Sequence, residues 1–181
     1  MQVITGKYRG RKLISPESAR PTLQRVKQSL FSTISDKIPN GKCLDLFAGS
    51  GALGIECISR GSAFVDFVEV DEDAVKCLKR NLKGVDPTTY SIQNVDYKVA
   101  LKRFQDAHKR FDLVFLDPPY KSGVYASVIE ILVRYDLLND GALVLAEMDL
   151  QNDLQFKQSK CIIYKIKEYG SLKIVILKKE V

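Results

Sequence analysis

Hydrophobic and polar positions follow two alternating periods along the chain from residue 42 onward. Short apolar runs of strand length, CLDLF, FVDFVEV, YSIQNV, DLVFL and ALVLAEM, are separated by segments with the apolar spacing of amphipathic helices. Alternation of strand and helix is typical of right-handed crossovers between parallel strands. The pattern therefore predicts an α/β fold with a mostly parallel, doubly wound sheet covered on both faces, and ligands at the carboxyl ends of the strands.

A basic extension precedes this alternating region. The apolar residues of PTLQRVKQSLFSTI, residues 21–34, lie on one face of a helix, and Pro21 and Thr22 supply its start signal. We therefore expect an extension carrying one helix over residues 1–40, packed on or reaching beyond a single Rossmann-like globular unit over residues 41–181.

The end of the sequence departs from the strand–helix alternation. Residues 161–179, CIIYKIKEYGSLKIVILKK, have the pattern of two strands joined by a turn at Tyr169, Gly170 and Ser171. This pattern predicts an antiparallel hairpin at the sheet edge.

The composition fits one cytosolic domain. With 181 residues and 45% hydrophobic content, the chain is long enough for a sizeable core and short for two domains. No apolar run reaches the roughly 18 residues that a membrane span needs, and the basic, polar start does not resemble a signal peptide. We expect a cytoplasmic protein with no membrane association.

Cysteine and histidine chemistry is not expected. The four cysteines lie far apart in apolar segments and form no CxxC pair, so we expect buried free thiols, no disulfide framework and no metal site. His108 lies in the charged stretch DAHKRFD, which predicts a solvated side chain at a helix end rather than a catalytic base.

The net charge of +6 is concentrated at the start of the chain. Residues 1–28 hold seven basic side chains and one acidic one, and the remaining residues hold 21 of each. The motif GKYRGRK combines cations, a stacking ring and flexible glycines, a mixture that suits nucleic acid. The alternative is a solvated terminus that serves solubility alone.

A glycine loop follows the first expected strand. In AGSGALG, Gly49, Gly51 and Gly54 match G-x-G-x-x-G, which lets the backbone turn tightly and the next helix point its amides at a ligand. Either Glu69 or Asp71, about 20 residues on, would accept ribose hydroxyls. Nicotinamide dinucleotides and S-adenosylmethionine both use such a loop, so a dehydrogenase stays open here.

Two further acids favour S-adenosylmethionine. Asp45, in the strand before the loop, would face the cationic amine of its methionine part, whereas a pyrophosphate would be repelled there. Alternatively, Asp45 is a buried acid hydrogen-bonded to neighbouring amides. Asp96 could lie beside the adenine amine or could equally cap the next helix.

The most specific signal is DLVFLDPPY, an apolar strand that ends in Asp117, Pro118, Pro119 and Tyr120. Consecutive prolines lack amide donors and restrict φ, so the strand end forms a rigid ledge with free carbonyls. The Asp117 carboxylate and the Pro118 carbonyl would accept the hydrogens of an exocyclic base amine, and Tyr120 would stack on the flipped base. The alternative is a strand followed by a proline turn.

These segments occur in the order found in a known family. VITGKYRGRKL, RPTLQRVKQSLF, LDLFAGSGALGIECISRG, VEVDEDAV, FDLVFLDPPY and EYGSLKIVIL make the chain resemble RsmD-type 16S ribosomal RNA guanine-N2 methyltransferases over nearly its whole length. The glycine loop and DPPY are shared with many amino-methyltransferases. The GKYRGRKL arm, the RPT helix start and the YG hairpin are together much more specific.

The resemblance implies methyl transfer from S-adenosylmethionine to a guanine N2 amine of 16S ribosomal RNA, with Asp117 to Tyr120 as the catalytic residues. We expect a monomer that acts on 16S ribosomal RNA, either free or within a small-subunit particle. The cofactor residues implied are Asp45, Phe47, Ala48, Gly49, Gly51, Glu69, Val70 and Asp96. The RNA contacts implied are Lys7, Tyr8, Arg9, Arg11, Lys12, Arg20, Thr22 and Arg25.

Some positions depart from the family pattern. Lys27 stands where an arginine is usual, and Gln24 and Gln28 stand where acids are frequent, which puts RNA contacts on that helix in doubt. Three other functions stay as alternatives: an adenine-N6 methyltransferase acting on DNA or RNA, a non-catalytic RNA-binding module with this fold, and a dehydrogenase. The intact Asp117 and loop glycines argue against the second.

Overall fold

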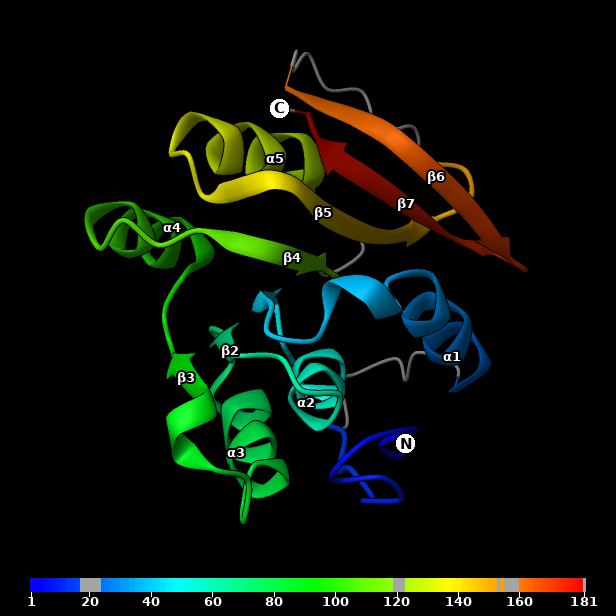
Figure 1. Ribbon diagram of the computed structural model, residues 1–181, viewed down its shortest axis with the longest axis vertical. Helices are drawn as coiled ribbons and strands as arrows, with labels where there is room; N and C mark the ends of the chain where they lie inside the picture. Colours follow the sequence, from blue (N-terminus) through cyan, green and yellow to red (C-terminus); the bar gives the residue numbers. More distant parts are fainter. Residues whose placement is uncertain (17–23, 119–122, 153, 155–159, 181) are drawn as a thin grey trace.

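A computed structural model describes residues 1–16, 24–118, 123–152, 154 and 160–180. It contains a seven-stranded sheet in the order β3-β2-β1-β4-β5-β7-β6 (Figure 1). The strands are β1 (Lys42–Leu46), β2 (Phe64–Val68), β3 (Tyr90–Gln93), β4 (Phe111–Leu116), β5 (Leu138–Asp149), β6 (Cys161–Tyr169) and β7 (Leu172–Lys179). The α-helices are α1 (Gln24–Thr33), α2 (Ala52–Ser59), α3 (Glu72–Asn81), α4 (Tyr97–Asp106) and α5 (Val124–Arg134).

The sheet confirms the predicted doubly wound topology. Strands β1 to β5 pair in parallel, whereas β7 is antiparallel to both β5 and β6. The turn predicted at residues 169–171 joins β6 to β7, and the hairpin forms the sheet edge with β6 outermost. Strand order reverses between β1 and β4, so the ligand crevice of this fold is expected at their carboxyl ends.

Helices cover both faces of the sheet and enclose two hydrophobic clusters. One cluster joins α1, α2 and α3 to the sheet, and the other joins α4 and α5 to the opposite face. Helix α1 is fixed by the Phe31 ring, whose centroid lies 6.0 Å from that of Phe115, and by the Tyr169 hydroxyl, which donates to Ser29 Oγ at 2.7 Å. Its start signal, Pro21 and Thr22, lies outside the described residues.

Three of the four cysteines are buried as expected, and His108 has the exposed position that its charged surroundings predicted. Cys43, Cys57 and Cys161 are buried free thiols, and Cys77 is a half-buried one. His108 is exposed just after the end of α4. Among the described helices, none is both long and apolar enough to cross a membrane.

The N-terminal arm, residues 1–14, packs on α2 (Figure 1, dark blue). An antiparallel bridge pairs Gln2 with Lys12, and Val3 and Leu13 are buried in the cluster shared with α1 and α2. Ser59 on α2 also holds the arm, because its hydroxyl donates to the Thr5 carbonyl at 2.6 Å. This part of the extension is therefore a packed layer of the structure.

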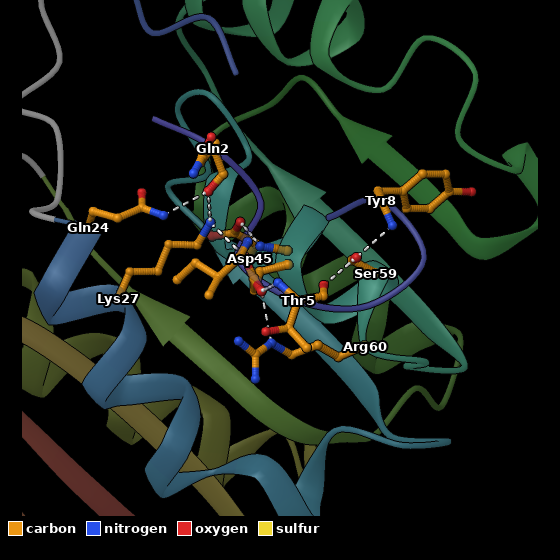
Figure 2. Close-up of polar contacts among 11 residues, drawn as sticks. Gln2, Thr5, Tyr8, Gln24, Lys27, Asp45, Ser59 and Arg60 are labelled. Carbon is orange, nitrogen blue, oxygen red and sulfur yellow. Dashed lines mark hydrogen bonds and ion pairs between the residues drawn. The ribbon is translucent and has the colours of Figure 1, made fainter. Parts of the chain in front are cut away.

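A buried carboxylate, Glu56 on α2, connects the arm to α1. Three of its partners, Thr5, Lys27 and Arg60, are labelled in Figure 2. Glu56 accepts the arm amides of Ile4 at 2.9 Å and Thr5 at 3.0 Å, and the Nε of Arg60 at 2.8 Å. Lys27 of α1 pairs with Glu56 at 2.9 Å, and both side chains are 0% exposed. Burial alone would raise the pKa of Glu56, but the Ile4 amide and the Lys27 ammonium hold that pKa below its usual range.

Lys27 therefore has a structural position rather than an RNA-facing one. Burial lowers the pKa of its ammonium, and the hydrogen bond and charge of Glu56 oppose that shift. Lys27 Nζ also donates to the carbonyl of Gln2 at 3.3 Å, as Figure 2 shows. Lys27, which stands where an arginine is usual in the resembling family, places its ammonium at the junction of α1, α2 and the arm.

The burial of this ion pair predicts a large effect of Glu56→Gln on stability. The variant leaves the Lys27 ammonium buried without an anionic partner, so the free energy of unfolding should fall by about 3–5 kcal/mol. Urea denaturation followed by circular dichroism measures it. The control is Asp73→Asn, which removes an exposed pair with Lys76 and should leave the midpoint almost unchanged. Equal effects of the two changes would contradict the structural role of Glu56.

Candidate active site

Four carboxylates from neighbouring strands lie at the carboxyl edge of the sheet. Asp45 lies on β1 and Glu147 on β5. Glu69 directly follows β2, and Asp117 directly follows β4. Asp45 pairs in register with Phe67 and Phe115, which lie two residues before Glu69 and Asp117. Since side chains two apart on a strand share a face, all four acids are placed on the α1–α2 face.

The site is electrostatically negative. Burial, together with the charges of Asp117 and Glu69, raises the pKa of Asp45 to about 7, although a backbone hydrogen bond opposes the shift. Burial raises the pKa of Asp117 to about 6, and burial together with the charge of Asp117 raises that of Glu147 to about 7. Such an edge attracts cationic ligands and hydrogen-bond donors and opposes anions.

The glycine loop turns back on itself between β1 and α2. Phe47, Gly49 and Gly51 all have positive φ, of 68°, 53° and 76°, so three residues of the turn are left-handed. A Cβ on Gly51 would lie 2.2 Å from a side-chain carbon of Leu78. Ala48 is buried inside the loop, where its carbonyl accepts the Gly51 amide at 2.7 Å.

Gly54 brings α2 close to the sheet and to Asp45. A Cβ at this position would lie 2.3 Å from the Phe67 ring, which explains the third glycine of the motif. Its amide donates to Asp45 Oδ2 at 2.9 Å. The alternative considered for Asp45, a buried acid bonded to a neighbouring amide, is thus observed, and it holds the carboxylate beneath the first turn of α2.

Of the two acids that could bind ribose, Glu69 lies beside the loop. Its carboxylate accepts the amides of Gly49 at 2.8 Å and of Val70 at 2.9 Å. Asp71 instead caps α3 by accepting the Ala74 amide at 2.7 Å. Val70, with 63% of its surface exposed, presents an apolar side chain next to Glu69.

Asp96 and Phe47 lie on the β3 side of the site. Asp96 caps α4, because its Oδ1 accepts the Lys98 amide at 2.8 Å. The helix cap was one of the two roles that the sequence left open for this residue. Its side chain is otherwise exposed. The ring of Tyr97 packs against Phe47 with 5.3 Å between centroids, so the loop and the start of α4 are in contact.

The first half of the DPPY motif lies at the end of β4. Asp117 is half-buried and Pro118 is buried, whereas Pro119 and Tyr120 lie outside the described residues. Glu147, which we did not select from the sequence, lies beside Asp117 on β5. The sequence contained a signal for it: an acid at the end of the apolar run ALVLAEM, at the edge where parallel strands gather their ligands.

The basic arm has both exposed and engaged cations. Lys7, Arg9 and Lys12 are exposed. The Arg11 guanidinium lies 5.2 Å from the centroid of the Tyr8 ring and donates to the carbonyls of residues 81 and 83 at 3.1 and 2.8 Å, at the end of α3. Arg11 thus fixes the arm to α3, an arrangement that the charge count did not predict.

Two other RNA candidates, Arg20 and Thr22, lie outside the described residues, and Arg25 is exposed on α1. Asn81 connects the arm with the glycine loop: it accepts the Ile14 amide at 2.8 Å and donates to the Ser50 carbonyl at 2.9 Å. In the described part of the chain, no group of three or more acids, cysteines or histidines is arranged to hold a metal ion.

The sheet order, the glycine loop and the fold of solved neighbours define the class: the fold is that of Rossmann-like, S-adenosylmethionine-dependent methyltransferases. A putative methyltransferase from Escherichia coli, yhhF, superposes with a TM-score of 0.87 and 31% identity, covering 99% of this chain and 98% of that one.

Comparison of sequences identifies the family. The family model described as Conserved hypothetical protein 95 matches residues 1–178. The putative rRNA methyltransferase YlbH of Bacillus subtilis is 35% identical over 99% of both chains. Ribosomal RNA small subunit methyltransferase D of Escherichia coli K12 is 32% identical over 99% of this chain and 90% of its own length. The chain belongs to this family, the RsmD family.

Proposed function

We propose that the protein transfers a methyl group from S-adenosylmethionine to the exocyclic N2 amine of a guanine in 16S ribosomal RNA. One observation carries the proposal: the Asp117–Pro118 ledge of β4 adjoins the Asp45 strand and its glycine loop at the point where strand order reverses. The name of the Escherichia coli relative, ribosomal RNA small subunit methyltransferase D, supports the substrate class.

The residues on the β1–β3 side fit the cofactor. When bound, S-adenosylmethionine supplies a methyl group on a positively charged sulfur. Asp45 would attract its ammonium, the Phe47 to Gly51 loop would lie along its backbone, and Glu69 would accept ribose hydroxyls. Val70 offers an apolar surface and Asp96 an exposed carboxylate for the adenine. The negative edge opposes a pyrophosphate, which argues against a nicotinamide dinucleotide.

The residues that follow β4 would hold the amine that receives the methyl group. The Asp117 carboxylate and the Pro118 carbonyl accept the two amine hydrogens, which aims the nitrogen lone pair at the methyl carbon. The carbon–nitrogen bond forms as the carbon–sulfur bond breaks, and the nitrogen then loses a proton to Asp117 or water. Pro119 would keep the ledge rigid and Tyr120 would stack on the base. Because the proton leaves after transfer, Asp117 acts as a positioner and no histidine base is needed.

Residues 1–40 would form the RNA-facing part. The exposed Lys7, Arg9 and Lys12 lie on an arm that is fixed to α2 by Glu56, so these cations are held in place before RNA arrives. The Tyr8 ring, whose centroid lies 5.6 Å from Lys7 Nζ and 5.2 Å from the Arg11 guanidinium, remains a stacking candidate. The substrate would be either free 16S RNA or a small-subunit particle.

The chemistry predicts a rate defect without a binding defect for Asp117→Asn. The variant should bind S-adenosylmethionine almost normally and should lose about a hundredfold or more in single-turnover methylation, because one preorganised acceptor is removed. Tritium transfer to small-subunit ribosomal RNA that lacks the modification, followed by nucleoside analysis, measures the rate and identifies the methylated atom. The control is Asp106→Asn, which changes an exposed acid at the end of α4. Wild-type rates in Asp117→Asn, or label outside guanine N2, would refute the proposal.

The exposed arm cations predict a change in the salt dependence of RNA binding. In the double variant Arg9→Ala and Lys12→Ala, the slope of log K against log salt should fall by up to about 1.4–1.8, or 0.7–0.9 for each lost phosphate contact. Arg11 is left intact because it fixes the arm to α3. The control removes two other exposed cations, Lys102 of α4 and Arg110 directly before β4. Equal salt slopes in the wild type and the arm variant would show that Arg9 and Lys12 make no phosphate contacts, and would leave the arm a structural role alone.

The raised pKa of Asp45 predicts a pH-dependent cofactor site. A bound ammonium favours the ionised carboxylate, so the affinity for S-adenosylhomocysteine, which carries the same amine, should fall by up to about tenfold from pH 8 to pH 6, as Asp45 is protonated near its pKa of about 7. Binding at pH 6.5 should release protons, seen by calorimetry in buffers of different ionisation enthalpy. Asp45→Asn should bind S-adenosylhomocysteine more weakly and should lose most of this pH dependence. An equally steep pH dependence in the variant would mean that another group is titrating.

A further inference from the structure

Asp117 and Glu147 form a pair of neighbouring acids at the end of the sheet. Leu116 pairs in register with Ala146 on the adjacent parallel strand, so Asp117 and Glu147 are next to each other one step further along. Adjacent strands lie about 4.8 Å apart. Both side chains are half-buried, and the charge of Asp117 acts on Glu147.

The two pairs of acids differ in how their oxygens are used. Asp45 and Glu69 accept backbone amides of the glycine loop and the helix that follows it. In the ranges that the structure describes, neither the Asp117 nor the Glu147 carboxylate receives a hydrogen bond or ion pair. Polar groups with restricted access to water are normally paired. The carboxylate oxygens of Asp117 and Glu147 are therefore available to accept hydrogen bonds from a ligand.

The order of the acids along the edge assigns them to different parts of the reaction. Strand order places Glu69 and Asp45 on the side of the glycine loop, Asp117 next, and Glu147 furthest from the loop. If Asp117 holds the amine that accepts the methyl group, Glu147 faces the part of the base that lies beyond this amine. On a purine, that part is the ring nitrogen N1 or N3 next to the amine-bearing carbon.

The two purines differ at N1. Guanine presents an N1–H donor beside its 2-amine, so its edge offers donors to two adjacent carboxylates. Adenine presents an N1 lone pair beside its 6-amine, which a carboxylate would repel. A base removed from its helix is recognised along this edge, and a site that places a charged acceptor there rejects a base without the donor.

We infer that Glu147 determines base specificity by accepting the N1–H of guanine while Asp117 holds the 2-amine. The inference rests on the proposed function and adds the residue that selects guanine over adenine. Its chemical signature is a preference for an N1–H donor, separate from the requirement for the amine itself.

The test replaces the target guanosine, once mapped with wild-type protein, by 2-aminopurine riboside in a ligated RNA. This analogue keeps the 2-amine but has a lone pair at N1. Wild-type protein should methylate the guanine RNA about 10- to 100-fold faster in single turnover. In Glu147→Gln the guanine rate should fall at least about tenfold, and the ratio of the two substrates should shrink to within about threefold, because the amide can donate to N1.

Two controls separate this role from a structural one. Glu130→Gln makes the same chemical change on the exposed surface of α5 and should keep the wild-type ratio. S-adenosylhomocysteine binding to Glu147→Gln should match wild type, which shows that the site is intact. The loss of the 6-oxygen in 2-aminopurine affects every variant equally, so only the change in ratio reports on Glu147.

An unchanged ratio in Glu147→Gln, with guanine still methylated by wild-type protein, would overturn the inference and leave the proposed function standing. A wild-type protein that labels no guanine N2 at all would overturn the proposed function and the inference with it. A Glu147→Ala variant that methylates guanine at the wild-type rate would also overturn the inference, since it lacks any acceptor.

Discussion

The buried Glu56 carboxylate is the interaction on which the arrangement of this protein depends. It accepts two amides of the arm and pairs with Arg60, at the end of α2, and with the Lys27 ammonium of α1. Neither the Lys27 nor the Glu56 side chain has any exposed surface. A carboxylate in that position is tolerated only because each of its oxygens is paired. The same helix, α2, begins at the glycine loop. The N-terminal arm and the glycine loop are therefore both attached to one helix, α2.

Charge is divided between two parts of the molecule. The net charge of +6 comes from the first 28 residues, whereas the carboxyl edge of the sheet gathers four acids with restricted access to water. A basic arm attracts phosphates over a range limited by salt, and an acidic, partly dry edge holds cations and hydrogen-bond donors at close range. Within the proposed function, the RNA backbone and the cofactor and base thus meet opposite potentials.

Several residues have positions that their local sequence could not distinguish. Asp71 and Glu69 are equivalent acids in the sequence, but Asp71 is used as the cap of α3. Arg11 and Arg9 are equivalent cations two residues apart, but Arg11 is turned to carbonyls some 70 residues away along the chain. Lys27 has an ordinary helical position and is completely buried. In each case the deciding partner comes from a distant segment, so the side-chain environment depends on packing.

The sequence by itself determined the strand and helix order, the doubly wound sheet, the hairpin at its edge, the glycine loop and the acid at the end of β4. These features follow from periodicity, turn chemistry and motifs a few residues long, all of which are local. Only the tertiary structure decided that Glu147 stands beside Asp117, that Asp45 is held by Gly54, and that Glu56 joins three segments. Such contacts depend on strand register and on which helix covers which face, and these are settled when distant segments pack together.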